Sequence, residues 1–135
     1  MVRIKAIYSG AKRCRAQHEP SETFLETDAP KDNQGLGESF SPTDLLATAL
    51  GTCILTTIAI VAERDGVSVV NAQMSVEKVM SASPRKVESL KTIIELPKSI
   101  PAEYRAKIET TGNNCPVKIS LHPDVSIPIE YRYSL

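Results

Sequence analysis

The segment from Ser41 to Gly66 constrains the fold more than any other, because it has the pattern of one long amphipathic helix. Ser41 is a suitable N-cap, and Pro42 stands at the first helical position, where its missing N–H costs nothing. Asp44 favours a capping box with Ser41, and Gly66 favours a stop. One apolar stripe follows the spacing i, i+1, i+4, i+5: Leu45, Leu46, Ala49, Leu50, Cys53, Ile54, Thr57, Ile58 and Val61. A helix with such a stripe needs other elements to cover it.

The segments on either side of this helix are mostly β-rich. Alternating apolar and polar residues predict strands over 2–8, 13–19 and 23–28, joined as an antiparallel meander. The loop over 29–42 is long, and long ordered loops are often functional. After the helix we expect strands over 67–80 and 86–97, a second helix over 101–114, a short turn or helix over 115–121, and a strand over 122–135. This order predicts a single α+β domain over residues 1–135.

Charge and composition exclude two classes of partner. The 16 Lys and Arg residues balance the 16 Asp and Glu residues, and no basic cluster stands out. We therefore expect neither a nucleic acid nor a membrane as a partner. The N-terminus lacks the apolar region of a signal peptide. Threonines interrupt the apolar run over 45–62, which favours a core helix rather than a membrane span. We therefore expect a cytoplasmic protein.

The spacing of cysteine and histidine gives no sign of a metal site. The 3 cysteines are an odd number, which argues against a disulfide framework in a reducing compartment. His18, His122 and the cysteines are scattered, without the paired spacing of zinc ligands. The Gly-Leu-Gly of the long loop is too short for a nucleotide-binding fingerprint. We expect no metal and no bound cofactor.

The cysteines themselves leave two interpretations open. Cys53 lies on the apolar stripe, where a free cysteine often serves as a small buried side chain. Cys115 follows the polar end of a helix and precedes Pro116, a setting that suits an accessible thiol or a buried loop residue equally. Cys14 alternates with charged neighbours on a strand and is interpreted as a packing or passive thiol. The residues alone therefore give two candidate reactive thiols, Cys53 and Cys115.

Two stretches of the chain resemble a known family. "SFSPTDLLATALGTC" followed by "NCPVKISLHP" resembles the OsmC/Ohr family, which includes osmotically inducible protein C and the organic hydroperoxide resistance proteins. The likeness extends over nearly the whole chain, through "EKVMSASPRKVESLKTIIELP" and "CPVKISLHPDVSIPIEYRY". It implies an α+β, OsmC-like fold with antiparallel sheets around a central long helix. It also implies an intertwined homodimer with its site at the subunit interface.

The same resemblance implies a chemistry for the two cysteines. Cys53 corresponds to the peroxidatic cysteine and Cys115 to the resolving cysteine of a thiol-dependent peroxidase. Such an enzyme reduces organic hydroperoxides to alcohols through a Cys53 sulfenic acid and a Cys53–Cys115 disulfide. An external thiol or dithiol then reduces the disulfide by exchange.

The chain departs from that family at the start of the long helix. Organic hydroperoxide resistance members carry a Glu directly after the helix-start proline, paired with an arginine from the N-terminal hairpin. Thr43 stands at that position here, and Asp44 is the nearest acid and a candidate polar partner. Arg13 or Arg15 is the closest match to the arginine that activates the Cys53 thiolate.

Other charged residues and other functions remain candidates at this stage. Arg85 is a further cation, and His18 and Glu38 are candidate polar neighbours of the site. The missing Glu favours an alternative, a non-catalytic redox-sensing or small apolar ligand-binding OsmC-like protein. The long apolar stripe is also compatible with a structural homodimer whose cysteines only pack.

Overall fold

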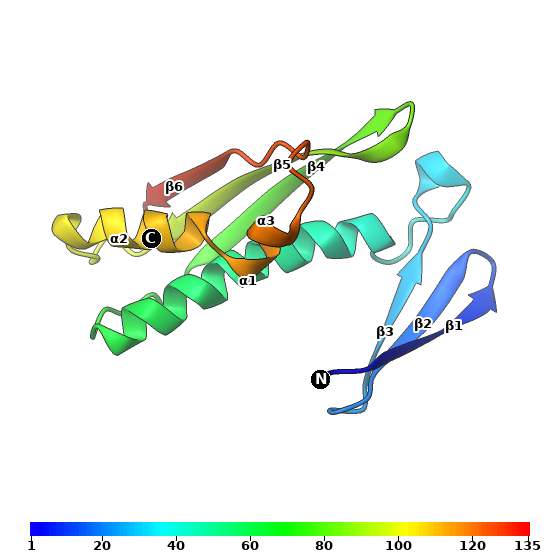
Figure 1. Cartoon of the computed structure of the whole chain (residues 1–135), viewed down its shortest axis with the longest axis horizontal. Coiled ribbons are helices and arrows are strands. Elements are labelled where there is room, and N and C mark those ends of the chain that lie inside the picture. The colour runs from blue at the N-terminus through cyan, green and yellow to red at the C-terminus, as the bar shows by residue number, and fades with distance from the viewer. The chain divides into compact units, whose positions relative to one another are not determined.

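The chain was analysed as a computed structural model that describes residues 1–135. It contains two compact units, Met1–Leu46 and Ala47–Leu135, which are described separately. The elements labelled in Figure 1 are β1 (Ile4–Gly10), β2 (Arg13–His18), β3 (Thr23–Asp28), α1 (Pro42–Arg64), β4 (Gln73–Ala82), β5 (Arg85–Leu96), α2 (Ala102–Asn113), α3 (Pro116–Ser120) and β6 (Ile129–Tyr133). A single 3-10 turn, Lys31–Asn33, lies between β3 and α1. The predicted α+β class is confirmed.

The first unit is built on the predicted antiparallel meander, in the order β1-β2-β3. Ala11 and Lys12 join β1 to β2 with φ values of 51° and 60°, the left-handed backbone that tight hairpin turns require. β1 begins two residues later than expected and continues to Gly10, where the ladder is irregular and φ is +89°. Glycine has no Cβ to clash there, so the strand can extend into the turn.

The long loop of the first unit closes on its own backbone. The Asp28 N–H donates to the Phe40 carbonyl at 3.0 Å, and the Gly37 N–H donates to the Ala29 carbonyl at 3.1 Å. Gly35 passes so close to Ala29 that no Cβ fits between the two backbones. The loop is therefore an ordered structure.

Helix α1 has the predicted ends. The Asp44 N–H donates to Ser41 Oγ at 3.1 Å, and the Ser41 N–H donates to Asp44 Oδ2 at 2.8 Å, which is a reciprocal capping box. At the other end Gly66 adopts φ +73°, and the Val67 N–H donates to the Ala62 carbonyl at 2.8 Å. The cap and the stop confirm the boundaries predicted from the sequence.

The second sheet has the order β4-β5-β6 and differs from the expectation in direction. β4 and β5 form an antiparallel hairpin, whereas β6 pairs in parallel with β5, placing Tyr131 opposite Ile94. The chain passes through α2 and α3 between β5 and β6, and a connection of that length permits parallel pairing. The expectation of antiparallel sheets therefore holds for the first sheet only.

Two predicted strands are longer in the sequence pattern than in the structure. β4 begins at Gln73 rather than at residue 67, because Asn71 has φ +69° and the Ala72 N–H closes a turn on Val69 at 3.0 Å. β6 covers only Ile129–Tyr133 of the expected strand over 122–135. Prolines 123 and 128 have no N–H to donate to a ladder, and residues 122–125 form a turn.

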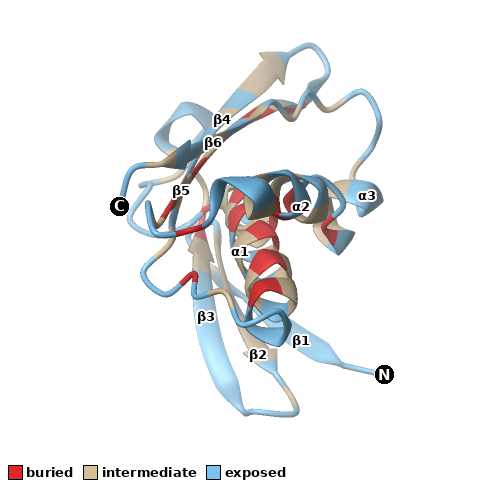
Figure 2. Ribbon diagram, turned by 90° about the vertical axis from the view of Figure 1, so that its left-hand side faces the viewer, coloured by how far each residue is buried: buried red, intermediate tan, exposed pale blue.

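The buried apolar core lies entirely in the second unit. Figure 2 shows buried residues repeating along α1, which are Ala47, Leu50, Gly51, Ile54, Ile58 and Ala62. The buried face therefore centres on one edge of the predicted stripe, and Cys53 falls at its border as a half-buried residue. Within residues 1–46 the only buried residues are polar, Asp28 and Ser41. Helix α1 is long and apolar enough to span a membrane, but a buried core helix can have the same length and composition.

Candidate functional site

Cys53 and Cys115 come together in the second unit. Cys53 lies about three turns into α1, and Cys115 precedes α3 directly. The Cys53 thiol acts on the Cys115 thiol by hydrogen bonding and by charge, so the two sulfurs are neighbours. The structure thus unites two cysteines that are far apart in the sequence, as the resemblance implied, while their individual chemical roles stay predictions.

Cys115 acts as the N-cap of α3. Its backbone is extended, with φ −62° and ψ 144°, because the following proline disfavours a helical residue before it. Pro116 occupies the first helical position and has no N–H, so the next free amides belong to Val117 and Lys118. Both amides act on the sulfur, and the Lys118 N–H donates to Cys115 Sγ at 3.4 Å. The thiol takes the capping position that Ser or Thr usually fills.

The surroundings of Cys115 act on its pKa in opposite directions. The residue has no exposed surface, and burial is the main factor that raises the pKa of its thiol above the ordinary value. The neighbouring Cys53 thiol raises the pKa of Cys115 further. The amides of Lys118 and Val117 lower it, but only in part, so the net shift is upward. Cys115 therefore stays protonated to higher pH than an exposed cysteine, which suits a thiol that does not react first.

Cys53 has a different setting on α1. It is half-buried, and its Sγ lies 3.9 Å from the Oγ1 of Thr57, one helical turn further on. The adjacent positions Leu50 and Ile54 are fully buried in the core. Cys53 is therefore the more accessible thiol of the pair, with the Thr57 hydroxyl on one side and the buried core residues Leu50 and Ile54 on the other.

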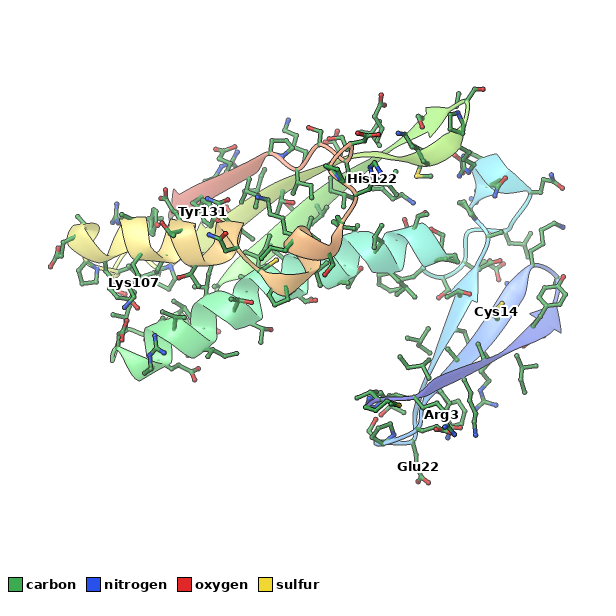
Figure 3. The ribbon with its side chains drawn as sticks, viewed as in Figure 1. Arg3, Cys14, Glu22, Lys107, His122 and Tyr131 are labelled. Atoms are coloured by element: carbon green, nitrogen blue, oxygen red, sulfur yellow. The ribbon has the colours of Figure 1, made fainter.

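Tyr131 of β6 and Gly112 of α2 complete the buried side of the site. The hydroxyl of Tyr131, which Figure 3 labels, donates to the Glu109 carbonyl at 3.4 Å, and Tyr131 interacts electrostatically with Cys115. Burial is the main factor that raises the pKa of Tyr131, with Glu109 and Cys115 adding to it, so the phenol is neutral. A Cβ on Gly112 would collide with this hydroxyl. Sequence reasoning missed both residues, although the alternation in "IEYRY" was a signal for an inward-facing, half-buried Tyr131.

The hairpin arginines have separate partners in the first unit. Arg13 forms an ion pair with Glu38 of the long loop, and its Nη2 also lies 3.6 Å from Asp28 Oδ2. The hydrogen bond and charge of Glu38, followed by the charge of Asp28, raise the pKa of Arg13. Arg15 instead stacks over the ring of Phe24 at 4.1 Å. Arg13 is therefore paired with carboxylates of the first unit, and Arg15 with an aromatic ring.

The remaining candidates lie outside the thiol pair. Asp44 serves the Ser41 cap, and Cys14 is half-buried on β2, opposite Tyr8 and Thr27 (Figure 3). His18 is exposed and lies 2.6 Å from the Ser21 hydroxyl. Arg85 is exposed at the start of β5. No group of three or more metal-ligating side chains converges in the chain.

A long capped helix beside a mixed sheet, with two cysteines brought together at the helix, defines a class of two-thiol α+β domains. The chain belongs to the OsmC-like protein family, whose model matches residues 35–130. This membership confirms the resemblance seen in the sequence.

Solved structures share the fold over nearly the whole chain. A protein from Psychrobacter arcticus 273-4, provisionally assigned as an osmotic stress induced and detoxification response protein, is 39% identical, with TM-score 0.92 and coverage of 98% of this chain and 96% of that one. An organic hydroperoxide resistance protein OsmC from Legionella pneumophila is 18% identical, with TM-score 0.75 over 98% and 96% of the two chains. The organic hydroperoxide resistance protein OhrB of Bacillus subtilis is 14% identical, with TM-score 0.70 over 98% of each chain. The two distant structures support the fold alone.

One curated relative also matches by sequence. The uncharacterized protein YmaD of Bacillus subtilis (strain 168) is 29% identical over 94 residues, which is 70% of this chain. The chain matches 62% of the length of that relative, less than two thirds.

Proposed function

We propose that the protein is a thiol-dependent peroxidase that reduces organic hydroperoxides to alcohols. The observation that carries this proposal is the pairing of an accessible thiol, Cys53, with a buried thiol, Cys115. Membership of the OsmC-like family supports it, since some structural neighbours are named organic hydroperoxide resistance proteins.

The proposed cycle needs only these two sulfurs and an external reductant. The Cys53 thiolate attacks the distal oxygen of the hydroperoxide, the O–O bond breaks, and the alkoxide takes a proton and leaves as an alcohol. The resulting Cys53 sulfenic acid condenses with the Cys115 thiol to a disulfide and releases water. A dithiol then reduces the disulfide by exchange. Leu46 and Ala49, two turns and one turn before Cys53 on α1, are half-buried apolar residues that favour an alkyl hydroperoxide, because burial of its hydrocarbon is favourable.

We propose Arg13 as the arginine that activates Cys53. Its support is the ion pair with Glu38, which reproduces the Arg–Glu pairing of the family with a different acid. Arg15 is the alternative, and its stacking on Phe24 gives it no comparable acidic partner. Arg13→Gln should lower kcat/KM for a hydroperoxide, whereas Arg15→Gln should not. A loss confined to Arg15→Gln would reverse the assignment.

A homodimer is part of the proposal. The sheet of the first unit exposes large apolar side chains, namely Ile4, Ile7, Tyr8, Phe24 and Leu25. Neighbouring residues of a strand point to opposite faces, so both faces of this sheet carry apolar groups. A sheet of this kind normally requires cover, and the family resemblance points to a second copy of the chain. Light scattering should give a molar mass near twice 14.7 kDa.

We place the protein in the cytoplasm, where thiols stay reduced.

The decisive experiment measures peroxide turnover. Reduced protein should consume cumene hydroperoxide or tert-butyl hydroperoxide in the presence of a dithiol. Cys53→Ser should abolish consumption, and Cys115→Ser should block the intramolecular disulfide. Cys14→Ser is the matched control and should retain turnover. Equal inactivity of the wild type and Cys53→Ser would refute the peroxidase.

The second candidate function is a non-catalytic redox sensor. Thr43 at the family's Glu position favours it, because the thiol then lacks its usual helix-start acid. A sensor should form the Cys53–Cys115 disulfide once with peroxide but should not turn over with excess dithiol. Mass spectrometry of peroxide-treated protein separates the two functions, because a peroxidase returns to the dithiol state with each cycle.

A further inference from the structure

The two sulfurs of the pair differ in how an external molecule can reach them. Cys115 has no exposed surface, whereas Cys53 is half-buried on α1. In thiol–disulfide exchange the attacking thiolate must reach one sulfur of the disulfide, and access to that sulfur sets which bond forms. An external thiol can therefore approach Cys53 more easily than Cys115, which is buried.

Backbone hydrogen bonds at the junction of α2 and α3 hold Cys115 in its buried position. The Cys115 N–H donates to the Gly112 carbonyl at 3.3 Å, and the Ile119 N–H donates to the Cys115 carbonyl at 3.1 Å. Gly112 is itself buried and lies against Tyr131 and Ile54 without room for a Cβ. Attack at Cys115 would require the junction of α2 and α3 to separate from this packing.

The same junction suits Cys115 to be the sulfur that leaves. The Lys118 N–H donates to its Sγ at 3.4 Å, with the Val117 N–H acting on it as well. Such donors strengthen when the acceptor becomes a thiolate. Burial, the main factor that raises the pKa of Cys115, persists in the mixed disulfide, whereas the smaller contribution of the Cys53 thiol disappears once Cys53 is bonded to the reductant. The departing charge on Cys115 is thus held by amides already in place.

We infer that the reductive half of the cycle runs in one direction, with an external dithiol attacking Cys53 and Cys115 leaving as a thiolate. The first thiolate of the dithiol bonds to Cys53 Sγ while the Cys53–Cys115 bond breaks, and the electron pair of that bond stays on Cys115. The second thiolate attacks the reductant's own sulfur and releases Cys53 as a thiolate, leaving the reductant as a disulfide. This inference rests on the proposed function, and it identifies the reductant's point of entry.

The test maps the mixed disulfide in protein that carries Cys14→Ser, so that only the pair reacts. Diamide forms the Cys53–Cys115 disulfide without any peroxide. The oxidised protein meets excess glutathione, is quenched in acid at short times, and is alkylated with N-ethylmaleimide and digested. Glutathione should lie on the Cys53 peptide and N-ethylmaleimide on the Cys115 peptide, in about tenfold excess over the reverse. Glutathione on Cys115, equal labelling of both, or no disulfide with diamide overturns the inference.

A second measurement decides the case in which the mixed disulfide decays too fast to trap. In the same background, Cys115→Ser leaves Cys53 and Cys53→Ser leaves Cys115 as the single thiol, and each is converted to its thionitrobenzoate disulfide. Dithiothreitol should release the chromophore from Cys53 about tenfold faster. Equal rates, or faster release from Cys115, overturn the inference. A lack of peroxide turnover refutes the peroxidase proposal separately, because neither measurement uses peroxide.

Discussion

Gly112→Ala tests the packing that holds the buried side of the thiol pair. A Cβ at this position would lie less than 3.0 Å from the Tyr131 hydroxyl, closer than real Cβ atoms approach. It would also lie 3.1 Å from Ile58 Cδ1 and 3.2 Å from Ile54 Cγ2. Tyr131 is paired with β5 through Ile94 and cannot withdraw without disturbing the sheet. The added methyl group therefore displaces packed side chains or the end of α2.

The expected loss follows from two opposing effects. Alanine gains up to about 1 kcal/mol over glycine in a helix, and less near a helix end. Forcing a methyl group into a packed core costs about 1–3 kcal/mol. We therefore expect Gly112→Ala to lower the free energy of unfolding by about 1–2 kcal/mol. The substitution should also slow formation of the Cys53–Cys115 disulfide, because the Cys115 N–H donates a hydrogen bond to the Gly112 carbonyl.

Gly51→Ala is the matched control, since Gly51 is also a buried glycine in a helix. The three atoms nearest to its Cβ would all belong to the Met74 side chain, with Sδ at 2.5 Å and Cε at 2.9 Å. The flexible thioether can move aside, so the change in stability should stay within about 1 kcal/mol of zero.

Urea unfolding at a fixed protein concentration measures all of these variants. Tyr131→Phe removes the hydroxyl that Gly112→Ala meets, so the double variant should recover part of the loss. The coupling energy between the two changes should be about 1 kcal/mol. If Gly112→Ala is as stable as the wild type, or if the two losses simply add, the reasoning is refuted.

Three further changes probe two charged side chains and one tyrosine. Arg13→Gln leaves the buried Asp28 without its ion-pair partner and should lower the urea midpoint, with an unchanged midpoint as the contrary result. The hydrogen bond from Lys107 is the main factor that lowers the pKa of Asp65 below 3.8. The stabilising effect of that carboxylate is therefore present above pH 3.8 and is lost as the pH falls through the lower folded value. The urea midpoints of wild type and Asp65→Asn should converge at acid pH, and a constant gap would contradict this. Burial raises the pKa of Tyr133 from 10.0 to about 12, so the wild type should lose stability relative to Tyr133→Phe as the pH rises across that interval, and ultraviolet titration should show the variant lacking one late-ionising phenol.

Local signals in the sequence predicted the long helix best. Ser41, Asp44 and Gly66 act within one turn of the chain, so their effect on the helix ends does not depend on distant packing. The three-strand meander was predictable for the same reason, because short turns fix its pairing. The domain assignment over 1–135 and the roles of the site residues stay predictions.

The predicted boundaries of β4 and β6 were wrong where apolar residues lie in a turn or in a connection between strands. Val69 is buried, but it belongs to the turn after α1 rather than to β4. The direction of β6 depends on a strand that precedes two helices, and no local pattern encodes that pairing. The burial of Cys115 has a similar origin. Its flanking Asn114 and Pro116 signal a turn, while the contacts that cover the thiol come from elements distant in sequence.

Because Cys115 is the N-cap of the five-residue helix α3, the order of that helix depends on whether the Cys53–Cys115 pair is reduced or oxidised. A sulfur that bonds to Cys53 accepts hydrogen bonds less strongly than a thiolate does, so at a pH high enough to ionise Cys115 the start of α3 is held more firmly in the reduced form. Thermodynamic linkage makes this reciprocal: whatever orders α3 also favours the reduced pair and makes its reduction potential less negative. Substitutions in α3 that leave both thiols untouched would therefore shift the redox balance of the protein through helix fraying alone.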